Sequence, residues 1–334
     1  MMDYKILIVK PSSLGDVVHS LPVLYALHKA YPGATIHWVI ASGLEGLLKG
    51  HPMIEKLWII NKDQWKRLSS LKNTFKEITA LGAALKRERY DIAIDLQGLL
   101  RSAVITALSR SKRRVGFKEA REGGTMFYTH RIEGGKDIHA VDRYMKIAAF
   151  AGADAGEAVF PLLYEDIRED WAESLKKGQY IVMAPGAAWM TKRWAARNFG
   201  LLAARFSIPA VVVGGRGDYA LGEEIVAHSG GMAINAAGKT TLKGLASLIR
   251  DARFMVTNDT GPMHIAAAAG VTVFAIFGPT DPKRTGPYGT GHTVIGRRIP
   301  CRPCFKKRCP TVECLRDLSF HYVYDTIKDK LKDV

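Results

Sequence analysis

Apolar residues along the chain gather in short, uninterrupted runs. In the first half the runs cover residues 5–9, 35–40, 57–60 and 90–95, and in the second half residues 180–184, 210–213, 254–256 and 271–276. Such a run is typical of a strand that is buried on both faces of a parallel sheet. Between the runs, apolar residues recur at helical spacing, as over 76–89, 198–206 and 242–249. Strands that alternate with helices predict an α/β fold built on doubly wound parallel sheets.

The two series of runs predict two domains of similar size. Residues 160–163, followed by a charged segment that we expect to be helical, form the expected linker. The predicted domains cover residues 1–165 and 166–334, each long enough for its own core, and the last helix is a candidate to pack back on the first domain. Two Rossmann-like sheets in tandem face each other across a cleft lined by the carboxyl ends of their strands, where such folds bind ligands.

The loop after the first predicted strand carries a carboxylate. It reads Pro-Ser-Ser-Leu-Gly-Asp over residues 11–16, so that Gly15 lets the backbone approach a substrate closely. Asp16 lies near a helix start, where it either takes part in catalysis or merely caps the helix. Pro22 leaves two interpretations of that helix open, a kink at the proline or a start at Ser20.

Two loops of the second half favour binding of a phosphate group. In residues 185–194, Lys192 and Arg193 lie between two tryptophans and either neutralise a diphosphate or form a solvated basic loop. Residues 258–264 follow a strand and open an alanine-rich helix, with Asp259 or Thr260 as the expected N-cap. A helix start of this kind presents N–H groups to a phosphate. Capping alone is the alternative, although it gives no role to His264.

Two other stretches resemble nucleotide-binding motifs without matching them. Residues 238–240 read Gly-Lys-Thr like the end of a P-loop, but Ala233 stands where that motif requires glycine. Residues 215–220 fit the Gly-x-Gly-x-x-Ala pattern after a strand, yet positions 231–241 hold no acid to bind a ribose. We interpret the second loop, which contains Asp218, as a nucleoside contact and not as an NAD site.

The chain is strongly basic, with 48 Lys and Arg against 32 Asp and Glu, a net charge of +16. Such a surface either keeps the protein soluble or attracts nucleic acid, an anionic membrane or a phosphorylated substrate. The sequence contains no zinc-finger, RRM or basic-heptad pattern, so we expect no nucleic-acid partner. It also lacks a run of about 18 apolar residues and a signal-peptide pattern, which predicts a cytoplasmic protein.

Metal-binding patterns are weak. The cysteines Cys301, Cys304, Cys309 and Cys314 lie close together in sequence and form either a structural zinc site or a reduced or locally bridged loop, without a catalytic role in either case. No Asp-x-Asp pair is present to hold a divalent ion against a nucleotide sugar. We therefore expect no cofactor and no catalytic metal, and a leaving diphosphate stabilised by lysines and helix starts.

Taken together, the motifs at 10–17, 95–99, 192–194 and 259–261, with His264, resemble the bacterial lipopolysaccharide heptosyltransferases of glycosyltransferase family nine, which have the GT-B fold. The resemblance spans almost the whole chain. Residues 120–122 and 139–143 are particularly similar to heptosyltransferase I, which adds the first heptose to the Kdo sugar of Kdo2-lipid A. Heptosyltransferase II, another ADP-sugar transferase of the family and a non-catalytic nucleotide-binding module are the alternatives.

The resemblance implies a metal-free, inverting transfer from ADP-heptose to Kdo2-lipid A by a monomer at the anionic cytoplasmic face of the inner membrane. Asp16 matches the catalytic base, and Lys192 matches the lysine that contacts the diphosphate. The implied donor-binding residues are Ser13, Gly15, Lys192, Asp218, Thr240, Asp259, Thr260, Gly261 and His264. The implied acceptor-binding residues are Lys66, Arg67, Gln97 and Arg121.

Overall fold

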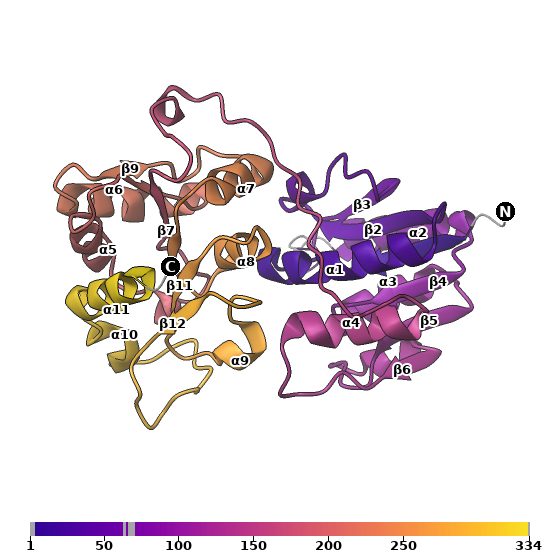
Figure 1. Cartoon of the computed structure of the whole chain (residues 1–334). Coiled ribbons are helices and arrows are strands. Elements are labelled where there is room, and N and C mark those ends of the chain that lie inside the picture. Colours follow the sequence, from indigo (N-terminus) through magenta and orange to yellow (C-terminus); the bar gives the residue numbers. More distant parts are fainter. Residues whose placement is uncertain (1–3, 63–64, 66–70, 333–334) are drawn as a thin grey trace. The chain divides into compact units, whose positions relative to one another are not determined.

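The computed structural model describes residues 4–62, 65 and 71–332 (Figure 1). The chain divides into two compact units, Met1–Leu163 and Tyr164–Val334. Each unit holds one six-stranded sheet in which every pairing is parallel. The α/β class and the two doubly wound parallel sheets that the hydrophobic runs predicted are therefore confirmed.

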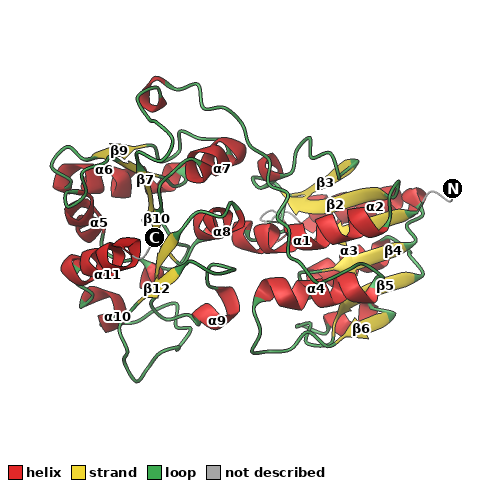
Figure 2. Cartoon of the chain, viewed as in Figure 1, coloured by secondary structure: helices red, strands yellow, loops and turns green. Residues whose placement is uncertain are grey.

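The first sheet has the strand order β3-β2-β1-β4-β5-β6. Its strands are β1 (Lys5–Val9), β2 (Thr35–Ala41), β3 (Lys56–Ile60), β4 (Ile92–Asp95), β5 (Arg113–Phe117) and β6 (His130–Ile132). Its helices are α1 (Leu14–Ala30), α2 (Leu71–Glu88), α3 (Leu100–Leu108) and α4 (Ala140–Phe150). Helix α1 packs against α4, and α2 packs against α3; Figure 2 shows the first pair in front of the strands.

The second sheet has the order β12-β11-β10-β7-β8-β9. Its strands are β7 (Ile181–Ala184), β8 (Ala210–Val212), β9 (Ala233–Asn235), β10 (Met255–Asn258), β11 (Val273–Ile276) and β12 (Thr293–Ile295). Its helices are α5 (Ala196–Ala203), α6 (Tyr219–His228), α7 (Leu242–Arg250), α8 (Gly261–Ala268), α9 (Pro282–Thr285), α10 (Glu313–Arg316) and α11 (Phe320–Lys332).

The strand order reverses direction at one point in each sheet. The chain runs outward from β1 through β2 to β3 and then returns to β4 on the other side of β1; in the second sheet β7 and β10 take the places of β1 and β4. Loops that leave the carboxyl ends of two such strands diverge and open a crevice, where doubly wound sheets bind their ligands. The crevice of the first sheet is bordered by the loops after β1 and β4, and that of the second by the loops after β7 and β10.

Two expectations about helices need correction. Helix α1 does not begin at Ser20, because it begins at Leu14 and includes Pro22. The charged segment after Leu163 forms no α-helix, and a single 3-10 turn follows at Asp170–Ala172.

The final helix, α11, contributes to the core of the second unit. Val323 and Ile327 on α11 are fully buried in the core of the second unit, together with Phe199 of α5. The apolar face of α11 is thus buried in the core of its own unit.

Candidate functional site

The crevice of the first sheet holds Asp16 at the start of α1. Its Oδ2 atom accepts hydrogen bonds from the backbone N–H of Ser13, at 2.9 Å, and from the Ser13 hydroxyl, at 2.8 Å. Ser13 is the N-cap residue of α1, so the carboxylate reaches back over the first turn as in a capping box. Gly15 is buried, whereas the Asp16 side chain remains 37% exposed.

Two buried side chains face the other carboxylate oxygen of Asp16. The Lys10 ammonium lies 3.7 Å from Oδ1, and the Tyr144 hydroxyl donates to Oδ1 at 3.2 Å. Lys10 also donates to the Tyr144 oxygen, at 2.8 Å, and to the Leu96 carbonyl, at 3.0 Å. Burial lowers the pKa of Lys10, opposed by the negative charges of Asp16 and Asp95, and burial raises the pKa of Tyr144 well above its usual value.

The loop after β4 meets the loop after β1 through Gln97. The Gln97 amide oxygen accepts from the backbone N–H of Ser12, at 3.2 Å. Asp95 is fully buried and shapes this loop, since its Oδ1 accepts from the N–H groups of Gln97 and Gly98 and its Oδ2 from the Tyr128 hydroxyl. The structure thus brings Ser13, Gly15, Asp16 and Gln97 together in the crevice of the first unit.

The crevice of the second sheet holds an ion pair between its two loops. The Lys192 ammonium lies 2.6 Å from Asp259 Oδ2, and the Thr280 hydroxyl donates to the same oxygen, also at 2.6 Å. Lys192 is 17% exposed and Asp259 5% exposed. The Lys192 ammonium also lies 4.7 Å from the ring centroid of Trp189. A solvated basic loop is therefore excluded for Lys192, which is largely buried and paired.

Asn258 fixes the loop that carries Lys192. Its amide group donates to the Pro185 carbonyl, at 2.7 Å, and accepts from the Trp194 N–H, at 3.2 Å. Trp194 is itself buried and donates its indole N–H to the Leu318 carbonyl. Both ends of the 185–194 loop are thereby attached to the end of β10.

Helix α8 begins as the sequence indicated. Thr260 is its N-cap residue, Gly261 its first residue, and Pro262 lies in the first turn. The Thr260 side chain makes no capping hydrogen bond, and the carboxylate of Asp259 binds Lys192 and Thr280. Capping therefore does not explain Asp259. His264 is 8% exposed, one turn into the helix.

Asp218 occupies the loop after β8. Its Oδ2 atom accepts from the Gly215 N–H, at 3.0 Å. A Cβ atom on Gly186 would lie 2.7 Å from the Asp218 carboxylate, so glycine is required where the loops after β7 and β8 meet. Thr240 lines a separate cavity of about 390 Å³ together with Glu165 and Gly244.

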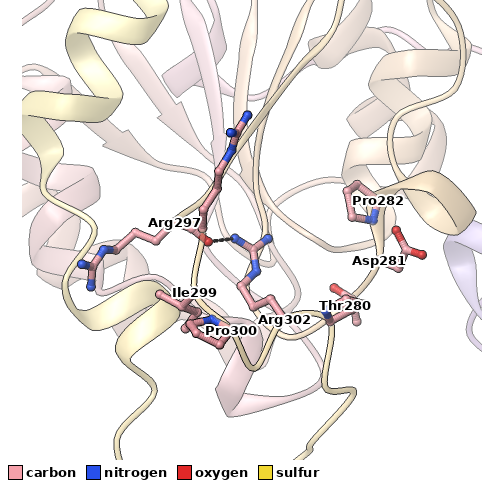
Figure 3. A pocket seen from close by; sticks show the side chains of 9 residues that line it. Thr280, Asp281, Pro282, Arg297, Ile299, Pro300 and Arg302 are labelled. Atoms are coloured by element: carbon pink, nitrogen blue, oxygen red, sulfur yellow. Dashed lines mark hydrogen bonds between the residues drawn. The ribbon is translucent and has the colours of Figure 1, made fainter.

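A basic cavity of about 510 Å³ adjoins the Lys192–Asp259 pair through Thr280. Figure 3 shows side chains that line it, among them Arg297 and Arg302, and Arg298 lines it as well. Arg302 is engaged by backbone carbonyls, since it donates to Gly278 at 2.6 Å and to Arg297 at 2.5 Å. Tyr144 and Thr280 are polar residues that the sequence did not identify as part of a site, and Lys10 was noted only as the first residue of the 10–17 motif.

The expected acceptor residues are only partly described. Lys66 and Arg67 lie outside the described residues, while Arg121 has an exposed side chain next to the loop that follows β4. The Arg121 backbone N–H donates to the Gly98 carbonyl, at 2.9 Å. This bond places the arginine beside the Asp95–Gly98 turn.

The four cysteines of the 301–314 segment are free thiols in the structure. Within residues 4–62, 65 and 71–332, no three His, Cys, Asp or Glu side chains lie where they could share one ion. The segment is therefore described as an unbridged loop, and a structural zinc site at these cysteines stays a prediction. Hydrogen bonds from Val312 and Thr311 lower the pKa of Cys309, whereas burial raises the pKa of Cys314.

Among the described residues, 4–62, 65 and 71–332, none of the helices has the length and the apolar composition of a membrane-spanning segment.

Comparison with known proteins identifies the class. The sequence model described as "Glycosyltransferase family 9 (heptosyltransferase)" matches residues 78–314. Lipopolysaccharide heptosyltransferase 1 of Pseudomonas aeruginosa is 33% identical, covering 92% of this chain and 89% of its own. Lipooligosaccharide heptosyltransferase 2 of Campylobacter jejuni is 27% identical, covering 98% and 99%. The Escherichia coli heptosyltransferase WaaC solved with ADP superimposes with a TM-score of 0.78 at 26% identity, covering 98% and 99%.

The two six-stranded parallel sheets and their switch-point loops, together with these relatives, define a glycosyltransferase of the GT-B class. The chain belongs to glycosyltransferase family 9 and is a heptosyltransferase of lipopolysaccharide core biosynthesis.

Proposed function

We propose that the chain transfers L-glycero-D-manno-heptose from its ADP ester to the Kdo residue of Kdo2-lipid A, with inversion and without a metal ion. The observation that carries the proposal is that Asp16 and Lys192 each lie at the switch point of their own sheet. There, ligands bind in doubly wound folds. Identity to a relative named heptosyltransferase 1, at 33%, favours this acceptor.

The proposed reaction needs one base and one site for the leaving group. The acceptor hydroxyl oxygen attacks the anomeric carbon from the face opposite ADP, and the bond from that carbon to the β-phosphate oxygen breaks, so that ADP leaves with the electron pair. A sugar hydroxyl becomes acidic only as its oxygen bonds the oxocarbenium-like carbon, and at that stage Asp16 accepts the proton. The exposed portion of its carboxylate gives access to the acceptor.

Negative charge that develops on ADP is matched by the second unit. Lys192 supplies a cation, and the first turn of α8, from Gly261, supplies backbone N–H groups. Because the Lys192 ammonium pairs with Asp259, which the Thr280 hydroxyl holds in turn, Lys192 presents a fixed charge instead of a mobile side chain. In the same proposal Asp218 contacts the ribose, Thr240 the adenine and His264 the donor sugar or diphosphate.

The acceptor is assigned to the first unit. Kdo carries a carboxylate, which a guanidinium binds with two parallel hydrogen bonds, and Arg121 has an exposed one beside the loop after β4. Gln97, and Lys66 and Arg67 beside Trp65, complete the proposed acceptor set.

We further propose that the protein works as a monomer, peripherally bound to the cytoplasmic face of the inner membrane. A net charge of +16 is attracted to anionic lipids, by about 1 kcal/mol for each Lys or Arg close to the surface. Sedimentation should therefore recover the protein with phosphatidylglycerol vesicles and not with phosphatidylcholine vesicles, and the bound fraction should fall as salt is added. Binding to both vesicle types would contradict the electrostatic part of this proposal.

The decisive experiment supplies ADP-heptose with Kdo2-lipid A and follows both ADP release and the mass of the lipid. A gain of one heptose on Kdo2-lipid A supports the proposal. A parallel reaction contains the acceptor that already carries the first heptose, since several relatives are named heptosyltransferase 2. Transfer only to that second acceptor would assign the chain to the next step of the same pathway.

A further inference from the structure

The buried polar cluster around Asp16 has a fixed direction of hydrogen bonding. Lys10 and Tyr144 are 1% and 5% exposed, so neither can exchange its partners for bulk water. An ammonium group only donates hydrogen bonds, and the Lys10 ammonium donates to the Tyr144 oxygen at 2.8 Å. The Tyr144 oxygen is therefore an acceptor toward Lys10, and its own proton points to Asp16 Oδ1, 3.2 Å away.

The cluster joins four elements of the first unit. Lys10 follows β1, the Leu96 carbonyl follows β4, Tyr144 is on α4, and Asp16 begins α1. Keeping a charged lysine in such a buried place costs free energy unless opposite charges and hydrogen bonds compensate it. Core packing alone would be served by an apolar side chain of similar length. The buried charge of Lys10 is thus better explained by an effect on the neighbouring Asp16 than by core packing.

We propose that Lys10 and Tyr144 are positioning residues that orient the carboxylate of Asp16 and keep it ionised for proton acceptance. The proposal rests on the function proposed above, in which Asp16 is the base. Ser13 fixes Oδ2 through two hydrogen bonds, and the Lys10–Tyr144 pair fixes Oδ1, so both oxygens are held without a metal ion. Burial lowers the pKa of Lys10, and the negative charge of Asp16 opposes this lowering and favours the ammonium form.

The other charged groups that act on the cluster are Arg143, on α4, and Asp95, at the end of β4. Their charges are opposite in sign. On α1 itself, His19 is a second titratable side chain, and its ring contacts that of His139 with centroids 5.0 Å apart. Of these groups, Tyr144 donates a hydrogen bond to Asp16 and Lys10 forms an ion pair with it.

The main test is Tyr144→Phe, which removes one hydroxyl and keeps the ring. Two readouts are followed against pH, the acid limb of kcat/KM for ADP release and the ¹³C chemical shift of the Asp16 carboxyl carbon, assigned with Asp16→Asn. A carboxylate that loses a donor binds its proton more tightly, so both transitions should move to higher pH by about half a unit. Lys10→Met also removes a charge, and the shift should then reach about one unit or more. At a pH above the shifted limb, much of kcat should return.

Tyr90→Phe is the matched control. Tyr90 is 4% exposed in the same unit, and its hydroxyl contacts Trp58 at 2.8 Å and His37 at 2.7 Å, away from Asp16. A merely structural hydroxyl would lower stability in both tyrosine variants and leave both transitions in place. That outcome for Tyr144→Phe would overturn the proposal, and Tyr144→Phe suffices if Lys10→Met fails to fold.

The two proposals fail in different ways. If Asp16→Asn retains full turnover, the base assignment is wrong and the present inference falls with it. If Asp16→Asn is inactive but Tyr144→Phe moves neither transition, only the inference about Lys10 and Tyr144 is wrong. The carboxyl titration needs no substrate, so it decides the positioning question even when the acceptor has been misidentified.

Discussion

At the scale of single residues, Asp16 combines a capping role and a site role that the sequence presented as alternatives. Its Oδ2 atom closes the first turn of α1 through Ser13, while Oδ1 faces Lys10 and Tyr144. The cap holds the carboxylate in one place, which is what a general base requires, because proton transfer is sensitive to small displacements. In the proposed mechanism, the capping contact of Asp16 therefore supports its role as the base.

Substituting Asp16 in two ways separates these roles. Asp16→Asn keeps an oxygen that can accept from Ser13 but cannot take up a proton, so turnover should fall about 100-fold or more with little loss of stability. Asp16→Ala should lose similar activity and, in addition, about 1 kcal/mol of stability from the missing cap. Kinetics and thermal unfolding of both variants, with ADP affinity as a check on folding, measure this. Equal turnover in Asp16→Asn and the unchanged protein would remove Asp16 from the mechanism.

Residue patterns in the sequence led to Asp16, Lys192 and Asp259 because each stands in a loop directly after an apolar run. They did not lead to Tyr144 or Thr280, and they gave Lys10 no role of its own within the 10–17 motif. Tyr144 is 128 positions from Asp16, and a tyrosine on an amphipathic helix has the pattern of an ordinary core residue. Only the packing of α4 against α1 places its hydroxyl at the carboxylate. Contacts between residues so far apart in the sequence depend on the tertiary fold, which the local spacing of residues does not reveal.

At the scale of elements, the second site depends on how two loops are attached to each other. Lys192 follows β7 and Asp259 follows β10, and these strands are hydrogen-bonded neighbours. Asn258, which is fully buried, binds Pro185 and Trp194 at the two ends of the Lys192 loop. The loop that carries Lys192, and with it the ion pair, is therefore fixed at both ends by the amide group of Asn258.

Asn258→Ala should consequently affect both stability and the chemical step. The Pro185 carbonyl and the Trp194 N–H would lose a buried partner, at a cost of about 1–3 kcal/mol each, and Lys192 would lose its fixed position. We expect lower thermal stability together with reduced ADP affinity and kcat. Tyr180→Phe is the control, because it deletes a buried hydrogen bond to Leu248 near the opposite end of β7. If both variants lower stability and spare ADP binding, the loop does not need Asn258.

The strand and helix pattern was predictable wherever an element was uniformly apolar. Strands β5 and β6 were not predicted because their sequences are short and partly basic, and β5 begins with Arg113 and Arg114. Strands β9 and β12 have only three residues each. Strands β6, β9 and β12 lie at the edges of their sheets, where only one side is paired, and the apolar pattern is weaker there.

At the scale of the whole molecule, catalysis by Lys192 and the start of α8 implies independence from divalent ions. No Asp-x-Asp pair occurs in the sequence to hold one. Activity should therefore survive EDTA, measured as ADP release before and after chelation. Loss of turnover that Mg²⁺ or Mn²⁺ restores would contradict the metal-free proposal. A loss of thermal stability that only Zn²⁺ restores would instead show that the free thiols at Cys301–Cys314 take up metal in solution.

The division into two units gives the last prediction, because donor and acceptor are assigned to different units. Arg121→Ala should raise the acceptor KM by the equivalent of about 1.5–3 kcal/mol, the range for a lost charged hydrogen bond, and leave ADP affinity unchanged. Lys192→Ala should weaken ADP and also slow the chemical step, since the charge it neutralises grows in the transition state. Calorimetry with ADP and kinetics with the acceptor, applied to both variants, test the assignment.

The two variants control for each other, as each removes one cation from one unit. Arg121 is exposed, so its loss should not disturb the core, whereas Lys192 is bound to Asp259 and its removal leaves a buried carboxylate with Thr280 as its remaining described partner. Lys192→Ala should therefore lower thermal stability as well, and Lys192→Ala/Asp259→Asn should recover part of that loss without recovering turnover. If Arg121→Ala weakens ADP and spares the acceptor, the assignment of the two units is reversed, and the proposed Kdo contact is wrong.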